Sequence, residues 1–290
     1  MKLYSINTGH FKLDGGAMFG VVPKVIWNNL NPPDENNLCS WAMRCLLIED
    51  GKRLMLIDNG IGNKQDERFM GHYHLHGTDT LDRSLAQHGF QRSDITDVFL
   101  THLHFDHCGG SIMREGDRLV PAFPNAVYWS NEAHWNWAVH PNDREKASFL
   151  KENILPIQES GQLQFVATPP PDEKASTLQS TGFAPGIDIL FAHGHTEAMM
   201  LPRIKYGEHT IVFLADLLPS IAHIPLPYVM AYDMFPLTTL NEKKQFLNEA
   251  LAQGHILFFE HDPLIECCRL QSTEKGIRAG EKFKLEELGL

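Results

Sequence analysis

The sequence predicts an α/β fold, in which short hydrophobic strands alternate with amphipathic helices. Apolar runs bounded by Gly, Pro, Asn or Asp are typical of buried strands, and the longer segments between them show the apolar spacing of helices. With 290 residues, of which 43% are hydrophobic, the chain is long enough to bury a large core. No low-complexity tract or short-period repeat interrupts this pattern.

The first half of the chain supplies four of these elements. Asp50-Gly51 is a typical hairpin turn, and Gly89 is a typical end of a helix. The expected elements are two strands within 43–57, a helix over 79–88 and a buried strand over 94–100.

The second half continues the alternation. Pro156 is expected to close one helix, and Gly254 is expected to cap another. The expected strands cover 126–130, 162–167, 187–192, 209–215 and 255–260, and the expected helices cover 131–139, 144–156 and 239–254.

A histidine or an aspartate follows a predicted strand five times. These residues are Asp58, the cluster over 102–107, His195, Asp216 and His261. Strand ends at one edge of stacked sheets can converge on a single site. We therefore expect the five strand exits to serve one site.

The cluster over 102–107 has the spacing His102-x-His104-x-Asp106-His107. A core disfavours so many polar side chains, because each buried polar group needs a partner. Imidazole nitrogens and carboxylate oxygens are ligands of zinc, and also of iron and manganese. His102 and His104 can face the same way, while Asp106 and His107 can serve a second ion. The cluster therefore predicts the first part of a metal site.

The remaining ligands are expected from the later strand exits. His195, Asp216 and His261 complete a set of seven, which suits two divalent ions that share a carboxylate and a water. Zinc is the expected metal, with manganese or iron as alternatives. His193 is the alternative to His195 as the metal ligand after the strand over 187–192. The alternating histidines at 72, 74 and 76 follow no buried strand, and a polar loop is favoured for them.

Composition narrows the classes of partner. Acidic residues outnumber basic ones by 36 to 25, which argues against general binding to nucleic acid or to an anionic membrane. No stretch has the length of a membrane span, and the first residues do not resemble a signal peptide. Five cysteines without C-x-x-C spacing fit reduced thiols, so a cytoplasmic protein is expected.

These residues resemble the metallo-β-lactamase superfamily over nearly the whole chain. The motif H-x-H-x-D-H appears as "HLHFDH", and the later ligands appear in "HGHT", "LADLLP" and "FEHDP". The resemblance implies a four-layer αβ/βα sandwich and a single domain over 1–290. Its N-terminal half carries the H-x-H-x-D-H motif, and its C-terminal half carries the bridging aspartate and the last histidine.

The resemblance also implies the role of each ligand. One ion takes His102, His104 and His195, the other takes Asp106, His107 and His261, and Asp216 bridges them. Asp58 in "LIDNG" is expected to orient the site by hydrogen bonding and not to bind metal.

Within the superfamily, "GGAMFGVVPK" and "AYDMFP" are similar to a lactonase-like branch. That branch includes quorum-quenching N-acyl homoserine lactonases and, more remotely, methyl parathion hydrolase. Two positions depart from it. Pro219 replaces a tyrosine that contacts the substrate carbonyl in several lactonases, and Ala198-Met199 replaces a common glycine-histidine pair.

The resulting hypothesis is a dinuclear metal-dependent hydrolase that opens a lactone or an ester. A water activated between the ions attacks the carbonyl, and Asp106 accepts or passes a proton. The alternatives are a glyoxalase-II-type thioesterase, a phosphotriesterase, and a mononuclear iron persulfide dioxygenase that uses mainly His102, His195 and Asp216.

The substrate contacts are expected from two segments. Residues 17–38 contain Met18, Phe19 and Trp27 in a long apolar stretch, and Tyr232 lies in "AYDMFP", which predicts a turn or a wall of the site. An apolar segment of this length can form a lid, an interface with a second copy of the chain, or part of the core. A homodimer is therefore one of the expectations.

Overall fold

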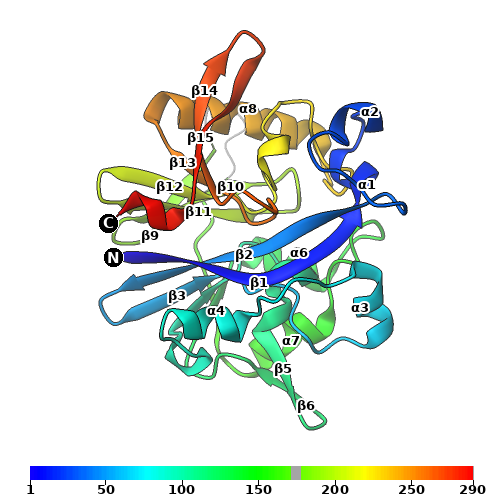
Figure 1. The fold of residues 1–290 in the computed structure, drawn as a ribbon. Coiled ribbons are helices and arrows are strands. Elements are labelled where there is room, and N and C mark those ends of the chain that lie inside the picture. The colour runs from blue at the N-terminus through cyan, green and yellow to red at the C-terminus, as the bar shows by residue number, and fades with distance from the viewer. Residues whose placement is uncertain (171–177, 290) are drawn as a thin grey trace. The chain divides into compact units, whose positions relative to one another are not determined.

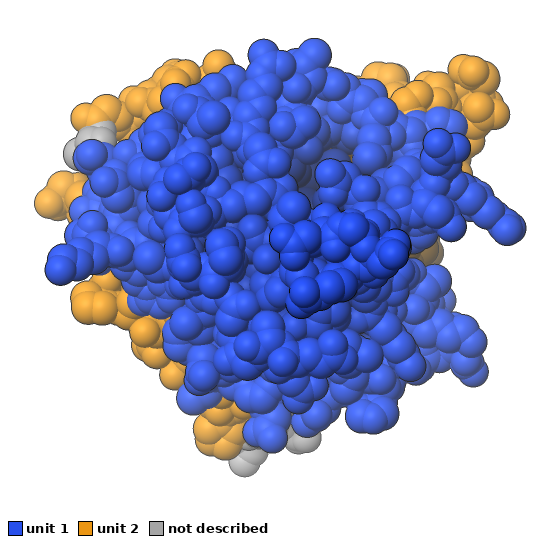
Figure 2. All heavy atoms as spheres, turned by 90° about the horizontal axis from the view of Figure 1, so that it is seen from below, with its two compact units in different colours: residues 1–10, 43–167 blue, residues 11–42, 168–290 orange. Residues whose placement is uncertain are grey.

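The computed structural model describes residues 1–170 and 178–289 (Figure 1). The chain divides into two compact units, which Figure 2 distinguishes by colour. Unit 1 comprises residues 1–10 and 43–167, and unit 2 comprises residues 11–42 and 168–290. The expected organisation as one domain over 1–290 stays a prediction.

The core of unit 1 is a mixed sheet with the strand order β1-β2-β3-β4-β7-β8. Strands β3, β4, β7 and β8 are parallel neighbours, whereas β2 and β3 form the predicted hairpin around the turn at Asp50-Gly51. The strands are β1 (Lys2–Asp14), β2 (Leu38–Asp50), β3 (Arg53–Ile57), β4 (Asp97–Phe99), β7 (Val127–Ser130) and β8 (Leu163–Phe165). Both β1 and β2 continue beyond the residue ranges of unit 1.

Three helices pack on this sheet through one hydrophobic cluster. Leu85 of α4, Trp135 of α6 and Ile157 of α7 join buried strand residues such as Leu56 and Val98. The helices of unit 1 are α3 (Glu67–Tyr73), α4 (Leu81–Gln87), α5 (Phe105–Cys108), α6 (Glu132–Val139) and α7 (Lys151–Glu159), with the short 3₁₀ helices η1 (Arg92–Asp94) and η2 (Gly109–Ser111) and the hairpin β5 (Ile112–Glu115) and β6 (Arg118–Pro121).

The prediction for helix 144–156 was wrong at both ends. The helix α7 begins at Lys151 and continues to Glu159, with Pro156 inside it. A proline removes one backbone hydrogen bond, and the burial of Ile154 and Ile157 on the same helix offsets that loss. The expected closure at Pro156 is therefore corrected.

Unit 2 contains a seven-stranded sheet with the order β15-β14-β13-β12-β11-β10-β9. The long helix α8 packs against β14 and β15 and ends at Gly254, which adopts the predicted left-handed conformation. The strands are β9 (Ser180–Ala184), β10 (Ile187–Ala192), β11 (Met199–Tyr206), β12 (His209–Phe213), β13 (Ile256–Phe258), β14 (Cys267–Thr273) and β15 (Gly276–Phe283). The helices are α1 (Gly15–Phe19), α2 (Lys24–Trp27), η3 (Ile221–His223), α8 (Pro236–Gln253) and η4 (Leu285–Leu288).

Unit 1 thus combines a six-stranded sheet and the β5–β6 hairpin with its helices, and unit 2 combines one sheet with its helices. The predicted α/β class is confirmed (Figure 1). The five predicted strand exits are also present. Asp58 follows β3, the histidine cluster follows β4, His195 follows β10, Asp216 follows β12 and His261 follows β13. Among the described residues, no helix combines the length and the hydrophobicity needed to cross a bilayer.

Candidate metal centre

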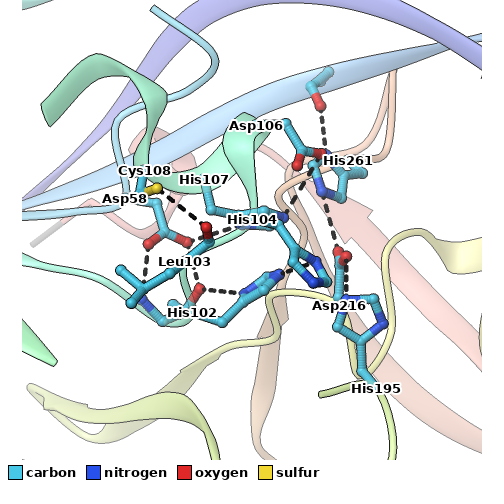
Figure 3. Close-up of polar contacts among 12 residues, drawn as sticks. Asp58, His102, Leu103, His104, Asp106, His107, Cys108, His195, Asp216 and His261 are labelled. Atoms are coloured by element: carbon cyan, nitrogen blue, oxygen red, sulfur yellow. Dashed lines mark hydrogen bonds and ion pairs between the residues drawn. The ribbon is translucent and has the colours of Figure 1, made fainter. Parts of the chain in front are cut away.

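Asp58 ties together the ends of two neighbouring parallel strands in unit 1. Its Oδ1 accepts a hydrogen bond from the backbone N of Thr101 at 2.8 Å, and its Oδ2 accepts one from Oγ1 of Thr101 at 2.6 Å (Figure 3). Both residues are fully buried. Because β3 and β4 are adjacent and parallel, their exits lie close enough for this contact.

The same carboxylate orients two predicted ligands. Nδ1 of His107 lies 3.1 Å from Oδ2 of Asp58, and Nδ1 of His102 lies 3.1 Å from Oγ1 of Thr101. The Thr101 hydroxyl gives its proton to Asp58, so it accepts a hydrogen bond from His102. These contacts are those that the predicted orienting role of Asp58 requires.

His104 has a buried carboxylate partner of its own, which the sequence did not indicate. Nε2 of His104 lies 2.9 Å from Oε1 of Glu145. Nε1 of Trp137 donates to Oε2 of Glu145 at 2.6 Å, and Nδ2 of Asn142 donates to the same oxygen at 3.3 Å. Glu145 precedes α7, in a segment that was predicted to be helical, and no local pattern separates it from an ordinary helix residue.

These partners fix which nitrogen of each imidazole carries its proton. His102 is protonated on Nδ1 and His104 on Nε2, because their partners accept hydrogen bonds there. The opposite nitrogens, Nε2 of His102 and Nδ1 of His104, therefore carry lone pairs. They lie only 3.1 Å apart (Figure 3). Two lone pairs at this distance repel each other unless a cation is placed between them.

Asp106 and His107 lie on the short helix α5, and each offers a ligand atom within 4.8 Å of the other. The glycines after them permit this placement. A Cβ at Gly109 would lie 2.1 Å from the carbonyl oxygen of Ile61, and one at Gly110 would lie 2.3 Å from that of Asn59. The pair Gly109-Gly110 is thus required for the close contact between the two strand exits.

In unit 2, Asp216 presents its two oxygens to two different histidines. Oδ2 of Asp216 lies 3.0 Å from Nε2 of His195, and Oδ1 lies 3.1 Å from Nε2 of His261 (Figure 3). Strands β12 and β13 are parallel neighbours, which brings the exits at Asp216 and His261 together. A carboxylate in this arrangement has the geometry of a bridging ligand.

In both histidines of unit 2, the ring nitrogen that points away from Asp216 also has a hydrogen-bond partner. Nδ1 of His195 lies 2.8 Å from Oδ1 of Asp233, and Nδ1 of His261 lies 2.8 Å from the carbonyl oxygen of Ala42. A carbonyl only accepts, so Nδ1 of His261 carries the proton. In the neutral histidines, both Nε2 lone pairs point at a carboxylate, which again calls for a cation.

The charges around His195 in unit 2 favour a positive charge beside Asp216. Burial by itself lowers the pKa of His195, but the carboxylates of Asp216 and Asp233 outweigh it and raise that pKa to about 10. The surroundings of His195 therefore stabilise a cation, either a proton or a metal ion.

The helix α8 holds the loop that carries His195. Glu242 accepts hydrogen bonds from the backbone N of His193 at 2.7 Å and of Gly194 at 3.0 Å. The side chain of His193 pairs with Glu197 at 3.2 Å and is 44% exposed. Of the two competing histidines, His195 is thus the one beside Asp216.

The other predicted positions lie as follows. Met18, Phe19 and Trp27 are buried, with Phe19 stacked on Trp27 at 5.3 Å between ring centroids, so these three side chains are part of the core. Val21 and Val25 of the same segment are exposed, as is Tyr232 at 37%. The predicted substrate contacts of these residues, and the lid and interface interpretations, stay predictions. The histidines at 72, 74 and 76 are exposed.

The donor set fits divalent ions of the zinc, iron and manganese group. Five imidazoles and two carboxylates are buried, each of the histidines is held by an acceptor at one nitrogen, and none of the seven is a cysteine. Hydrogen-bonded histidine ligands of this kind are typical of metal sites in proteins. The seven residues are His102, His104, Asp106 and His107 in unit 1 and His195, Asp216 and His261 in unit 2.

Known proteins resemble this chain in sequence and in structure. N-acyl homoserine lactonase from Bacillus cereus is 22% identical over 278 residues, which cover 90% of this chain and 93% of its own length. A probable metal-dependent hydrolase from Staphylococcus aureus has a similar structure, with a TM-score of 0.86, 26% identity and coverage of 98% of this chain and 97% of its own. AidC, a dizinc quorum-quenching lactonase solved in complex with a product, aligns with a TM-score of 0.77, 21% identity and coverage of 97% and 95%.

These relatives are hydrolases, and the prediction of a metal-dependent hydrolase is confirmed at that level. The predicted fold class is likewise confirmed, because the similarity to the Staphylococcus aureus structure extends over nearly the whole chain. The model of the metallo-β-lactamase superfamily matches residues 44–261. The chain therefore belongs to the metallo-β-lactamase superfamily.

Proposed function

We propose that this metallohydrolase opens a lactone ring, with N-acyl homoserine lactones as the preferred substrate class. The structural observation that carries the proposal is the geometry of Asp216, whose two oxygens face His195 and His261. Such an arrangement lets one carboxylate oxygen face each of two ions, which is our reason for favouring two metals over a single iron. The lactone is favoured because relatives covering 90% of this chain are N-acyl homoserine lactonases.

We further propose that the ligands of the two units together hold two divalent ions. Zinc is favoured, since the structural relative AidC is a dizinc enzyme, with manganese and iron as the alternatives. Two observations on this chain support the proposal. The lone pairs of His102 and His104 face each other, and the two oxygens of Asp216 face two different histidines, as in a bridging ligand. The proposed assignment is His102, His104 and His195 for one ion, Asp106, His107 and His261 for the other, and Asp216 between them.

When bound, two such ions supply a nucleophilic water at neutral pH and an electrophile for the carbonyl oxygen. The side chains of the chain do the rest. Asp106 accepts the proton of the attacking water and passes it to the oxygen of the leaving alcohol. Asp58, Glu145 and Asp233 keep the protons of His107, His104 and His195 on the nitrogens that face away from the reaction. The product is a hydroxy acid, which releases one proton.

One departure from the lactonase pattern bears on the substrate. Pro219 stands where several lactonases have a tyrosine that contacts the carbonyl, and its own carbonyl oxygen accepts a hydrogen bond from the backbone N of His261 at 3.2 Å. Pro219 thus supports a ligand loop and offers no phenol to a substrate. Aryl esters, thioesters and phosphotriesters therefore belong in the same assay.

The test follows proton release by purified, metal-analysed protein on N-acyl homoserine lactones of short and long chain. We expect kcat/KM above about 10⁴ M⁻¹s⁻¹, two metal ions per chain, and loss of both activity and metal in Asp216→Ala. The matched control is Asp117→Ala, which removes an exposed carboxylate in a turn. Two bound ions without lactone turnover would remove the lactone from the proposal. One iron without any hydrolysis would move the protein to oxygen chemistry.

The proposed setting is a cytoplasmic enzyme with a small-molecule substrate. The free cysteines are all buried, as is usual for structural thiols in a reducing compartment. A homodimer through residues 17–38 stays a prediction, which sedimentation of the purified protein tests.

A further inference from the structure

Unit 2 contains a cavity of about 520 Å³ that involves none of the seven predicted ligands. Its walls come from the loop after η3 (residues 224–227), from α8, and from Lys275 with the first residues of β15 (276–278). The volume lies within the range of small-molecule pockets, which is roughly 300–1,000 Å³.

The floor and sides of this cavity are largely apolar. Ile224 and Leu247 are almost fully buried beneath it, while Leu226 and Ile277 line it and stay partly accessible. Apolar surface that remains open to solvent gains free energy when a hydrocarbon covers it. The lining therefore favours an occupant with an apolar body.

Three cationic side chains, Lys244, Lys275 and Arg278, also line the cavity, and no acidic residue does. None of the three forms an ion pair with any residue in the described part of the chain, where Nη1 of Arg278 donates to the carbonyl oxygen of Ile277. The whole chain carries a formal charge of −11. Three cations that line one cavity without a carboxylate partner favour an anion there.

The wall formed by residues 224–227 is fixed from inside. Nζ of the buried Lys243 donates to the carbonyl oxygens of Pro225, Leu226 and Tyr228, at 3.2, 3.3 and 2.6 Å. Lys243 precedes Lys244 on α8, so the helix provides both the anchor of the wall and one of its cations. A wall held in this way is present before a ligand arrives, which lowers the entropic cost of binding.

We propose that this cavity binds an amphipathic carboxylate, in which a medium-length hydrocarbon chain carries one anionic head group. The chain covers the surface of Ile224, Leu226 and Ile277, and the head group lies among the three cations. The burial of methylene groups supplies most of the affinity, and the exposed charge pairs add a smaller contribution. The site stands apart from the hydrolytic reaction and does not depend on which substrate is hydrolysed.

The test is calorimetric titration of the full-length, metal-loaded protein with sodium decanoate. We expect saturable binding with one site per chain attributable to this cavity. In Lys244→Glu/Arg278→Glu the dissociation constant is expected to rise roughly tenfold, because two attractive contacts become repulsive. The matched control is Lys52→Glu/Lys205→Glu, which makes the same change of charge at two exposed lysines outside the cavity. The control is expected to bind decanoate as the unmodified protein does.

A second double variant and a second ligand complete the experiment. Lys244→Met/Arg278→Met removes the two charges without introducing repulsion. Circular dichroism and metal content show whether each variant is folded. Decanol tests the head group and is expected to bind several-fold more weakly than decanoate. Binding of decanoate that is equal in all variants, as expected if it occupies the metal centre, would overturn the proposal. Equal binding of decanol would do so as well.

Discussion

Nε2 of His104 lies 2.9 Å from Oε1 of Glu145, and both side chains are nearly inaccessible to solvent. Glu145 therefore decides which nitrogen of His104 carries the proton. Replacing Glu145 by Ala is expected to weaken metal binding roughly 10- to 100-fold, as is usual when the partner of a ligand histidine is lost. Competition with a chelator measures this affinity.

The variants Glu145→Gln and Glu132→Ala complete that experiment. Gln keeps an oxygen that can accept from His104, so it is expected to retain more affinity than Ala. Glu132 is an exposed acid on α6, and its removal is expected to change nothing. Equal affinity of Glu145→Ala and the unmodified protein would show that Glu145 does not orient His104.

Gly109 is expected to tolerate no side chain. Its Cβ would lie 2.1 Å from a carbonyl oxygen of the neighbouring loop, so Gly109→Ala has to displace the segment that follows Asp106 and His107. We expect loss of one bound ion and of hydrolysis, measured by metal analysis and activity. Gly71→Ala is the control, because a Cβ at Gly71 meets nothing within 4 Å. Full metal content in Gly109→Ala would contradict the tight packing.

His223 is expected to make the free energy of unfolding fall as the solution becomes acidic. Burial lowers its pKa to about 3, while Ser220 and the carbonyl oxygen of Met18 hold its two nitrogens. Above pH 6.5 it is neutral in both the folded and the unfolded chain. Below pH 6.5 only the unfolded chain takes up the proton, so the free energy of unfolding falls as the pH drops from 6.5 towards 3.

The measurement compares the free energy of unfolding at pH 7 and pH 5. His223 alone is expected to lower it by about 2 kcal/mol over that interval. His223→Gln does not titrate, so its stability is expected to fall less between the two values, even if it is lower at pH 7. Parallel curves for the two proteins would mean that His223 titrates normally in the folded state.

Replacing Phe19 or Trp27 is expected to affect the stability of the fold more than the choice of substrate. Both rings are buried and stacked, and truncating such a ring to Ala costs about 3–5 kcal/mol. Phe19→Ala is thus expected to lower the midpoint of denaturation strongly, whereas Val25→Ala, at an exposed position, is expected to have little effect. A rise in KM confined to long-chain lactones, without loss of stability, would restore the lid interpretation.

The strand exits were predictable because their signal is local. A hydrophobic run ending in His or Asp is visible in a few residues, and all five exits are present, including those at Asp58 and Asp216. The seven proposed ligands were chosen from the motif spacing, the strand exits and the family resemblance. Their joint function as one centre rests on the family pattern and on the geometry within each unit.

The partners of the ligands were not predictable in the same way. Glu145 lies 41 residues from His104, Asp233 lies 38 residues from His195, and the carbonyl of Ala42 lies 219 residues from His261. Such pairs depend on how the chain folds back, and an acid in a helical segment gives no sign of its partner. Tyr232-Asp233 was predicted only as a turn or wall, without its histidine.

Three of the strands that the sequence did not predict, β11, β14 and β15, were missed for a different reason. β11 contains Pro202, which pairs with Ile189 of β10, and a proline within a run argues against a strand. β14 and β15 are rich in exposed charged and polar residues, including Arg278 and Glu281. Their pairing within a sheet that α8 covers compensates for the weak intrinsic strand preference of these residues.

The fixed protonation pattern of the histidines limits how this centre can change during evolution. An aspartate in place of His104 would set a second carboxylate against Glu145, and one in place of His195 would do the same against Asp233. A single ligand exchange therefore creates a buried repulsion that only a second, distant substitution relieves. New activities are therefore expected to arise more readily from changes in the pocket or in the bound ion than from changes in the proposed ligands.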